Sequence, residues 1–382
     1  MSNFHFFKTT CKRNFIDHMR YFLTVLLFAM FPVLGISQDI SKLTNLNDAI
    51  AETSGLVFFD NRLITHNDSG GMNALYEINE ANGDISRTVT IQNATNRDWE
   101  DICADDDYIY IGDFGNNNGS RTDLKIYKVL KTDYLSSDQV NAELIEFSYE
   151  DQNDFTSSPN STNFDAEALI SFGADLYIFT KNWVDQRTNI YKLPKIKGSY
   201  VAEKIDEFDA EGLVTGGTFN PLASKVVLTG YSGIRAFVIE LRGFTNGIFS
   251  NGVIDKYNLN IPLPASFQTE AVTYSDISNF YISAEKNALG SAALYSLVSN
   301  TLSVGDFNLI QNEVYPNPAG ETLTIETKVD LKKIEIYDYL GKKVFEDTAA
   351  NKKINISQFS KGMYILKLYA GNRTSSVKFL KD

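Results

Sequence analysis

Short runs of Val, Ile, Leu, Tyr and Phe recur along residues 39–310, separated by turn-forming Asn, Gly, Asp and Ser. No stretch of this region shows the 3.6-residue spacing of apolar positions that marks an amphipathic helix. Short β-branched and aromatic runs bounded by turn residues are typical of strands. The pattern therefore predicts an all-β fold.

Comparing this region with itself reveals five related segments. Each begins with a polar residue, a small residue and an aliphatic residue, and continues through a turn into an aromatic and aliphatic strand. The five segments are residues 54–68, 100–113, 167–181, 211–230 and 270–285. Recurring units of four short strands are typical of propeller blades. We therefore predict a β-propeller at residues 38–310 with five four-stranded blades, leaving a sixth, degenerate blade open. Residues 40–46 are expected to supply the strand that closes the ring.

The pattern changes after residue 308. A turn-rich segment around Pro316 and Pro318 leads into short alternating strands. These strands are expected near residues 322–325, 334–338, 343–345, 354–356, 362–368 and 376–380. Alternating strands of this kind predict a small β-sandwich at residues 311–382.

The first residues have the organisation of an export signal. Arg20 precedes an apolar run at residues 21–31, and Gly35-Ile36-Ser37 follows as a small-residue exit. This order predicts a signal peptide at residues 1–37, with Met19 as an alternative start. The alternative, a transmembrane anchor, requires a longer apolar run. We expect no membrane span in the mature chain.

Composition narrows the classes of partner. The chain carries 35 Lys and Arg against 48 Asp and Glu, a net charge of −13, which argues against nucleic acid as a ligand. Cys11 lies in the predicted leader, so a mature chain with Cys103 alone forms no internal disulfide. His66 is the one histidine beyond the leader, which disfavours zinc. We expect a monomer that binds an extracellular glycan or peptide.

Several motifs near the C-terminus carry a family resemblance. They are Tyr315-Pro316-Asn317-Pro318, Ile334-Glu335-Ile336-Tyr337-Asp338 with Gly341-Lys342, Gly362-Met363-Tyr364 and Lys378-Phe379-Leu380-Lys381. In this order and spacing they resemble the type A C-terminal sorting domain of the type IX (Por) secretion system. The resemblance implies export through the periplasm and outer membrane, contact with that machinery through residues 313–382, and a secreted or cell-surface location.

A second resemblance covers about residues 48–300. Motifs such as His66-Asn67-Asp68-Ser69-Gly70 and Asp98-Trp99-Glu100-Asp101 look like those of secreted bacterial propellers with no assigned activity. The layout is more distantly similar to calcium-dependent lactonase-like and phytase-like propellers. No catalytic motif of either group can be placed on this sequence.

The alignment of the five segments also lines up acidic residues. Equivalent positions at the start of the innermost strands are occupied by Glu100, Glu167, Glu211 and Glu270, and Asp98, Asp165 and Asp209 precede three of them by two residues. Equivalent positions in a propeller form a ring around its axis, so we expect these carboxylates to crowd one mouth of the channel. Carboxylates about 7 Å apart repel by roughly 2–3 kcal/mol per pair at an effective dielectric near 20. The ring must therefore bind a cation, retain protons or pair with basic side chains.

Two interpretations of this ring remain open. Oxygen ligands favour Ca²⁺, which predicts an axial metal site made by the seven acids. Alternatively Arg97, Lys181 and Lys286 pair with the acids and fix the register of the blades.

Two hypotheses of function follow. In the first, the propeller is a binding module with a cation at its channel mouth. In the second, it is a calcium-dependent hydrolase of the lactonase or phosphatase type, with His66 as a base that Asp68 orients. The loop at residues 66–71 is alternatively a β-turn with an Asx side chain, for which Asn-Asp-Ser-Gly is well suited.

Overall fold

The structure is a computed structural model that describes residues 37–261, 265–299, 312–327, 329–338, 342–370 and 373–382. The predicted signal peptide, residues 1–37, lies outside the described residues except for Ser37. The proposed boundary near residue 310 also lies outside them.

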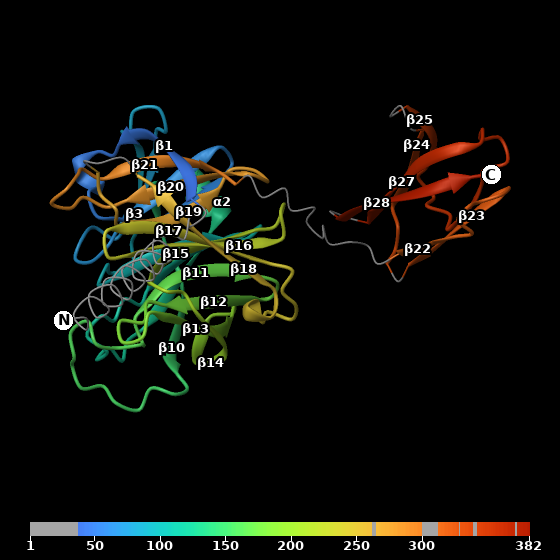
Figure 1. Ribbon diagram of the computed structural model, residues 1–382. Helices are drawn as coiled ribbons and strands as arrows, with labels where there is room; N and C mark the ends of the chain where they lie inside the picture. The colour runs from blue at the N-terminus through green and yellow to red at the C-terminus, as the bar shows by residue number, and fades with distance from the viewer. Residues whose placement is uncertain (1–36, 262–264, 300–311, 328, 339–341, 371–372) are drawn as a thin grey trace, which may run out of the picture. The chain divides into compact units, whose positions relative to one another are not determined.

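The first part of the chain contains three sheets, two of eight strands and one of five, which divide into five four-stranded blades and one short edge strand (Figure 1). Blade 1 contains β2 (Thr53–Phe59), β3 (Arg62–Asn67), β4 (Ala74–Ile78) and β5 (Ile85–Ile91). Blade 2 contains β6 (Trp99–Ala104), β7 (Tyr108–Asp113), β8 (Lys125–Leu130) and β10 (Glu143–Tyr149). Blade 3 contains β11 (Ala166–Phe172), β12 (Asp175–Thr180), β13 (Arg187–Pro194) and β14 (Gly198–Asp209). Blade 4 contains β15 (Leu213–Asn220), β16 (Lys225–Ser232), β17 (Arg235–Arg242) and β18 (Val253–Asn260). Blade 5 contains β19 (Thr269–Tyr274), β20 (Asn279–Ala284), β21 (Ala293–Val298) and β1 (Ser37–Asn45).

The innermost strands form a closed ring. β2, β6, β11, β15 and β19 each contact the next in this order, and β19 contacts β2. The first strand of the fold completes the last blade, because β1 pairs antiparallel with β21 from Ile40 opposite Leu297 to Asn45 opposite Ala293 (Figure 1). The strand predicted to close the ring is therefore confirmed.

Each hydrophobic cluster of the propeller lies between two neighbouring blades. Trp99 of β6, for example, is fully buried in a cluster with Leu75 of β4, and Phe237 of β17 packs in a cluster with Phe179 of β12. There are five such clusters among the described residues, one for each pair of neighbours around the ring. A blade alone would leave both faces of its sheet in water, so burial of apolar area drives closure of the ring.

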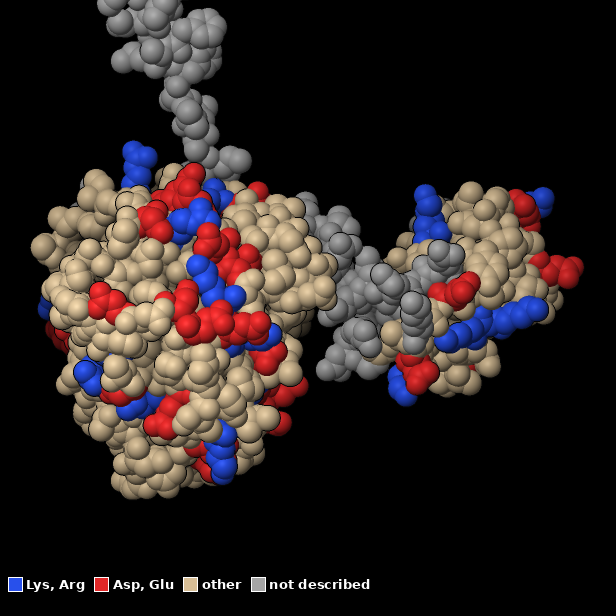
Figure 2. All heavy atoms as spheres, turned by 90° about the horizontal axis from the view of Figure 1, so that it is seen from below, with Lys and Arg blue, Asp and Glu red and all other residues tan. Residues whose placement is uncertain are grey.

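Few elements interrupt the strands. Between β8 and β10 the chain forms α2 (Lys131–Ser136) and the short strand β9 (Gln139–Val140), which pairs in parallel with β5. The 3₁₀ turn η1 (Asp48–Ile50) connects β1 of blade 5 to β2 of blade 1, and η2 (Phe249–Asn251) lies between β17 and β18 of blade 4. On the face shown in Figure 2, acidic and basic side chains alternate rather than forming a patch of one sign.

The C-terminal residues form a separate β-sandwich. One sheet contains β22 (Asn312–Tyr315), β23 (Thr322–Thr327) and β26 (Lys353–Asn355). The other contains β25 (Lys343–Asp347), β24 (Lys333–Asp338), β27 (Gly362–Ala370) and β28 (Arg373–Lys381). Leu323, Ile336, Leu366 and Phe379 meet in its core, and none of them is exposed. The predicted fold class, a β-propeller followed by a small β-sandwich, is confirmed, with five blades among the described residues.

Candidate functional site at the acidic channel mouth

Every innermost strand of the propeller carries a β-bulge near its start. The register of each inner hairpin shifts by one residue, which leaves a single extra residue in the inner strand. These five residues, which we call the axial ring, are Ser54, Glu100, Glu167, Thr215 and Glu270. A bulge re-aims one side chain of a strand. Members of the ring reach the neighbouring blades: the Ser54 hydroxyl donates to the Glu100 carbonyl at 2.6 Å, and that of Thr215 donates to the Thr269 carbonyl at 2.5 Å.

Blade 4 contributes Thr215 to this ring, and the sequence alignment that placed Glu211 there is wrong by four residues. Glu211 is exposed and precedes β15, with a backbone φ of 51°. Its amide donates to the carboxylate of Asp209, which is also exposed, and its carbonyl accepts from Lys256. Glu211 and Asp209 therefore lie outside the buried acidic cluster.

Three acids from blades 1 and 2 meet closely, and we call them the acidic triad. Asp68 follows β3, Asp98 precedes β6 and Glu100 is the bulge residue of β6. One carboxylate oxygen of each lies within 4.8 Å of the others. Gly115 packs so closely over Asp98 and Glu100 that a Cβ at this position would lie 2.0 Å from Glu100 Oε1 and 2.6 Å from Asp98 Oδ2.

No basic side chain forms an ion pair with the triad in the described structure. Burial and the negative charge of Asp98 raise the pKa of Asp68 to about 7, and burial raises that of Asp98 to about 6. Burial, followed by repulsion from Asp68 and Glu167, raises the pKa of Glu100 well above its usual value. Arg121 and Arg97 lower the pKa of Asp98 from a distance, but among the described residues their ion pairs are with Asp113 and Asp123. Asp68 Oδ1 is buried without a hydrogen-bond partner in the described part of the chain.

The acids of blades 3 and 5 share a lysine. Lys181 Nζ donates to Glu167 Oε1 at 2.9 Å and is buried with it. Its charge lowers the pKa of Glu270, which burial nevertheless raises to about 8. Asp165 has a different function: its two oxygens accept from the amide of Asn116 at 2.5 Å and from Trp183 Nε1 at 2.7 Å.

Of the three basic residues predicted to pair with the acids, one does so and two pair elsewhere. Lys181 takes the predicted place beside Glu167, whereas Arg97 pairs with Asp123 at 2.5 Å and Lys286 pairs with exposed Asp48 at 3.5 Å. Glu167 is therefore paired with Lys181, whereas no basic side chain of the described structure forms an ion pair with the triad.

His66 is part of the core. It is fully buried, its Nδ1 lies 3.0 Å from the Asn67 carbonyl, and its ring meets Trp99 edge-on. Its Nε2 faces Gly55, where an added Cβ would lie 2.4 Å away. Burial lowers the pKa of His66 to about 4. A buried neutral imidazole packed against backbone is poorly placed to act as a general base, so the structure gives no support to that hypothesis.

Because of the acidic mouth, the stability of the protein without bound cations is expected to depend on pH. In chelator, we expect the free energy of unfolding to fall between pH 6.5 and pH 8, on the order of 2 kcal/mol. Asp68 and Glu270 each have a higher pKa in the folded protein than in the unfolded protein. The resulting stabilisation is fully present below the unfolded-state pKa and is lost as the pH rises through the folded-state pKa. His66 acts in the opposite sense below pH 6.5, because its lowered pKa makes acid destabilising. Urea titrations at several pH values measure how steeply the free energy of unfolding falls with pH. E270Q should make this fall shallower. The same fall in E270Q as in the wild type would contradict the assignment to Glu270.

Asp101 links neighbouring blades next to the ring, and sequence reasoning did not single it out. Its Oδ2 accepts from the amide of Leu169 at 2.8 Å and from that of Gly217 at 3.1 Å, which belong to blades 3 and 4. Its Oδ1 accepts from the Ile102 amide at 2.8 Å. The residues that follow the bulge in the other blades are small, namely Gly55, Ala168, Gly216 and Ala271. One carboxylate can therefore occupy the axis and link three blades.

Residues 313–382 match the family described as Secretion system C-terminal sorting domain. The match covers the β-sandwich, from within β22 to the end of β28. The protein is a cargo of the type IX secretion system. This cargo is exported to the cell surface or the extracellular space, as its motifs implied. Within the described residues, no helix of the cargo has the length and hydrophobicity needed to span a bilayer.

Among characterised proteins, the ulvan lyase NLR42 of Nonlabens ulvanivorans is 24% identical to the cargo over 211 residues. The similarity covers 48% of the cargo and 38% of the lyase, so the cargo spans less than two fifths of the length of that relative.

Three solved structures resemble the cargo at low similarity. PorZ of Porphyromonas gingivalis, a surface component of the type IX secretion system, has a TM-score of 0.31 at 11% identity, covering 86% of the cargo and 45% of PorZ. A gluconolactonase of Xanthomonas campestris has a TM-score of 0.38 at 13% identity, covering 65% and 72% of the two chains. An α-L-arabinanase of Penicillium chrysogenum has a TM-score of 0.41 at 6% identity, covering 69% and 98%. These likenesses transfer no activity to the cargo.

Proposed function

We propose that the propeller of this cargo is a non-catalytic binding module that holds one divalent cation, Ca²⁺ by preference, on Asp68, Asp98 and Glu100. The observation that carries the proposal is the convergence of three carboxylate oxygens within 4.8 Å with no basic side chain paired to them in the described structure. Such a group is stable with protons or with a cation. The oxygen donors and their charge suit Ca²⁺ better than a transition metal.

The triad leaves room for an outside ligand on the metal. Glu100 is buried, whereas Asp68 and Asp98 are partly exposed. Ca²⁺ takes about 6–8 oxygen ligands, so three carboxylates leave positions for water or for oxygens of a bound molecule. Glycans and peptides both offer such oxygens, and the cation would join them to the propeller.

A hydrolytic function has less support. The base expected for it, His66, is buried and neutral, and its unpartnered Nε2 faces Gly55. Neither the lyase nor the gluconolactonase and arabinanase above are similar enough to supply a catalytic residue.

Calcium titration of the mature full-length protein tests the proposal. We expect one Ca²⁺ per chain, and E100Q should weaken binding at least about tenfold because it removes one charged ligand. Saturation at about 100 times the dissociation constant should stabilise the wild-type propeller by roughly 2.7 kcal/mol.

E211Q is the matched control. Glu211 was aligned with Glu100 from the sequence but is exposed and lies outside the triad, so its substitution should leave calcium affinity unchanged. The proposal fails if the purified protein binds no calcium, or if E100Q and E211Q bind it equally well. Thermal melts with and without chelator provide a second readout that needs no knowledge of the outer ligand.

A further inference from the structure

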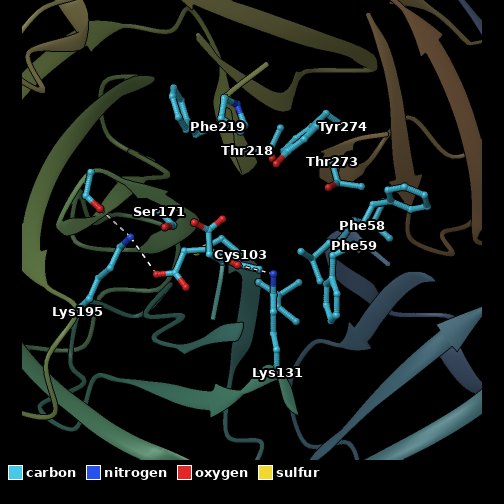
Figure 3. Close-up of a pocket in the computed structure, with 18 residues that line it drawn as sticks. Phe58, Phe59, Cys103, Lys131, Ser171, Lys195, Thr218, Phe219, Thr273 and Tyr274 are labelled. Atoms are coloured by element: carbon cyan, nitrogen blue, oxygen red, sulfur yellow. Dashed lines mark hydrogen bonds and ion pairs between the residues drawn. The ribbon is translucent and has the colours of Figure 1, made fainter. Parts of the chain in front are cut away.

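A cavity lies at the opposite mouth of the channel (Figure 3). It has a volume of about 270 Å³ and is bounded by the later residues of all five innermost strands, whereas the axial ring occupies their first residues. Asp101 lies between the two along β6, hydrogen-bonded across the axis. The cavity is thus a second site, distinct from the acidic triad.

Aromatic rings form much of its wall. Phe58 and Phe59 at the end of β2, Phe219 of β15 and Tyr274 of β19 all line the cavity and are partly exposed (Figure 3). Each ring also packs against a hydrophobic cluster between two blades, which holds it in place at the edge of the cavity. Partly exposed rings around a small concave site are suited to stacking against a flat apolar face of a ligand.

Polar groups for hydrogen bonding lie among these rings. Ser171, Thr218 and Thr273 come from three successive innermost strands and line the cavity. Their hydroxyl groups have no hydrogen bond to another described residue, in contrast to Ser54 and Thr215 at the acidic mouth. Hydroxyl groups that face a cavity in this way are available to a bound molecule.

Two lysines reach the same cavity but differ in their partners. Lys195 Nζ is neutralised by Asp105 at 3.1 Å and also donates to the Gly173 carbonyl at 2.9 Å. Lys131, the first residue of α2, donates to the main-chain carbonyl of Asp105 and lies 4.4 Å from the centre of the Phe59 ring.

Lys131 therefore retains a positive charge without a carboxylate bound to it. No described carboxylate lies within ion-pair distance of its ammonium group, although Asp105, Asp106 and Asp107 are near enough to raise its pKa. Half-burial outweighs them and lowers that pKa. A partly desolvated ammonium over an aromatic face favours an anionic partner.

We propose that this cavity binds a small carboxylate-bearing ring compound, with its carboxylate on Lys131, its flat face on the aromatic wall and its hydroxyl groups on Ser171, Thr218 and Thr273. The volume is near the lower end for ligand pockets, about 300 Å³, and fits one six-membered ring. A uronate sugar and an aromatic acid share this chemistry. The two differ in hydrogen bonding: a uronate sugar has hydroxyl groups that can bond to Ser171, Thr218 and Thr273, whereas an unsubstituted aromatic ring has none.

Binding of glucuronate, benzoate and glucose to the mature full-length protein, by calorimetry and ligand-observed NMR, tests the proposal. We expect at least one of the two acids to bind. If the ligand is a sugar acid, glucose should bind at least about tenfold more weakly than glucuronate, because glucose lacks the carboxylate. K131M should weaken binding of the acid at least about tenfold, and K131R should restore part of it. K286M is the matched control, since Lys286 is an exposed lysine that does not line this cavity.

The paired variant T218V/T273V distinguishes the two sources. A loss of glucuronate binding with benzoate unaffected assigns the site to a sugar acid, and benzoate binding alone assigns it to an aromatic acid. The proposal is overturned if neither acid binds at about 10 mM, since such weak binding falls below the range of specific recognition. It is also overturned if K131M binds as tightly as K286M. Calcium binding at the triad is measured separately, so the two proposals fail independently.

Discussion

A variant that ends before residue 313 is expected to fold but to remain inside the cell envelope. Residues 313–382 are the sorting domain, so their removal takes away the element that the type IX machinery recognises. The propeller should still fold, because its five hydrophobic clusters contain no residue of the sorting domain. Immunoblots of periplasm, outer membrane and medium measure the distribution, and the exported fraction should fall to background.

Two controls make this result specific. The full-length E211Q variant changes one exposed side chain and should be exported like the wild type. A fusion of residues 313–382 to an unrelated periplasmic protein should gain export. Normal levels of the truncated chain in the medium would show that export depends on some other part of the cargo.

The second large effect is expected from Asp101. D101A should destabilise the propeller by about 3–5 kcal/mol, because it leaves the amides of Ile102, Leu169 and Gly217 without their acceptor in a buried site. D101N should have a smaller effect, since an amide oxygen can still accept from two of the three donors. Urea unfolding followed by tryptophan fluorescence reports on the propeller alone, because both tryptophans of the chain, Trp99 and Trp183, belong to it.

Asp106 is the comparison residue for this experiment. It lies in the turn that follows the same strand but is exposed, so D106A should change stability by less than about 0.5 kcal/mol. Equal midpoints for D101A and D106A would mean that the axial hydrogen bonds contribute no net stability.

Sequence patterns were sufficient for the architecture because each blade presents the same local signals. Strand composition, turn residues and the recurring inner hairpin identified five blades, the closing strand and the C-terminal sandwich. In blade 4 the same signals were misleading: Glu211-Gly212-Leu213-Val214 imitates the start of an inner strand, but β15 begins at Leu213 and its bulge falls on Thr215. The segment at residues 211–230 is longer than the other four segments, which was a sign of this error in the sequence.

The chemistry of the site depended on contacts that spacing alone does not specify. Glu100, Glu167 and Glu270 could be aligned, but which of them meets Lys181 and which meets Asp68 is set by side-chain direction around the axis. Asp101 stands beside Glu100 in the sequence, and the bulge between them decides that one faces the mouth and the other links the blades. Lys131 lies in a short helix outside the repeating pattern, so no alignment of blades could have placed it at a channel end.

The pairing of β1 with β21 has a mechanical consequence. The two strands run in opposite directions, and the chain enters β1 at the same end of the pair at which it leaves β21. Tension applied through these two connections would load the hydrogen bonds one after another, from Ile40 and Leu297 towards Asn45 and Ala293, rather than all together. A cargo pulled at these two connections would thus lose the pairing of β1 with β21 one hydrogen bond at a time.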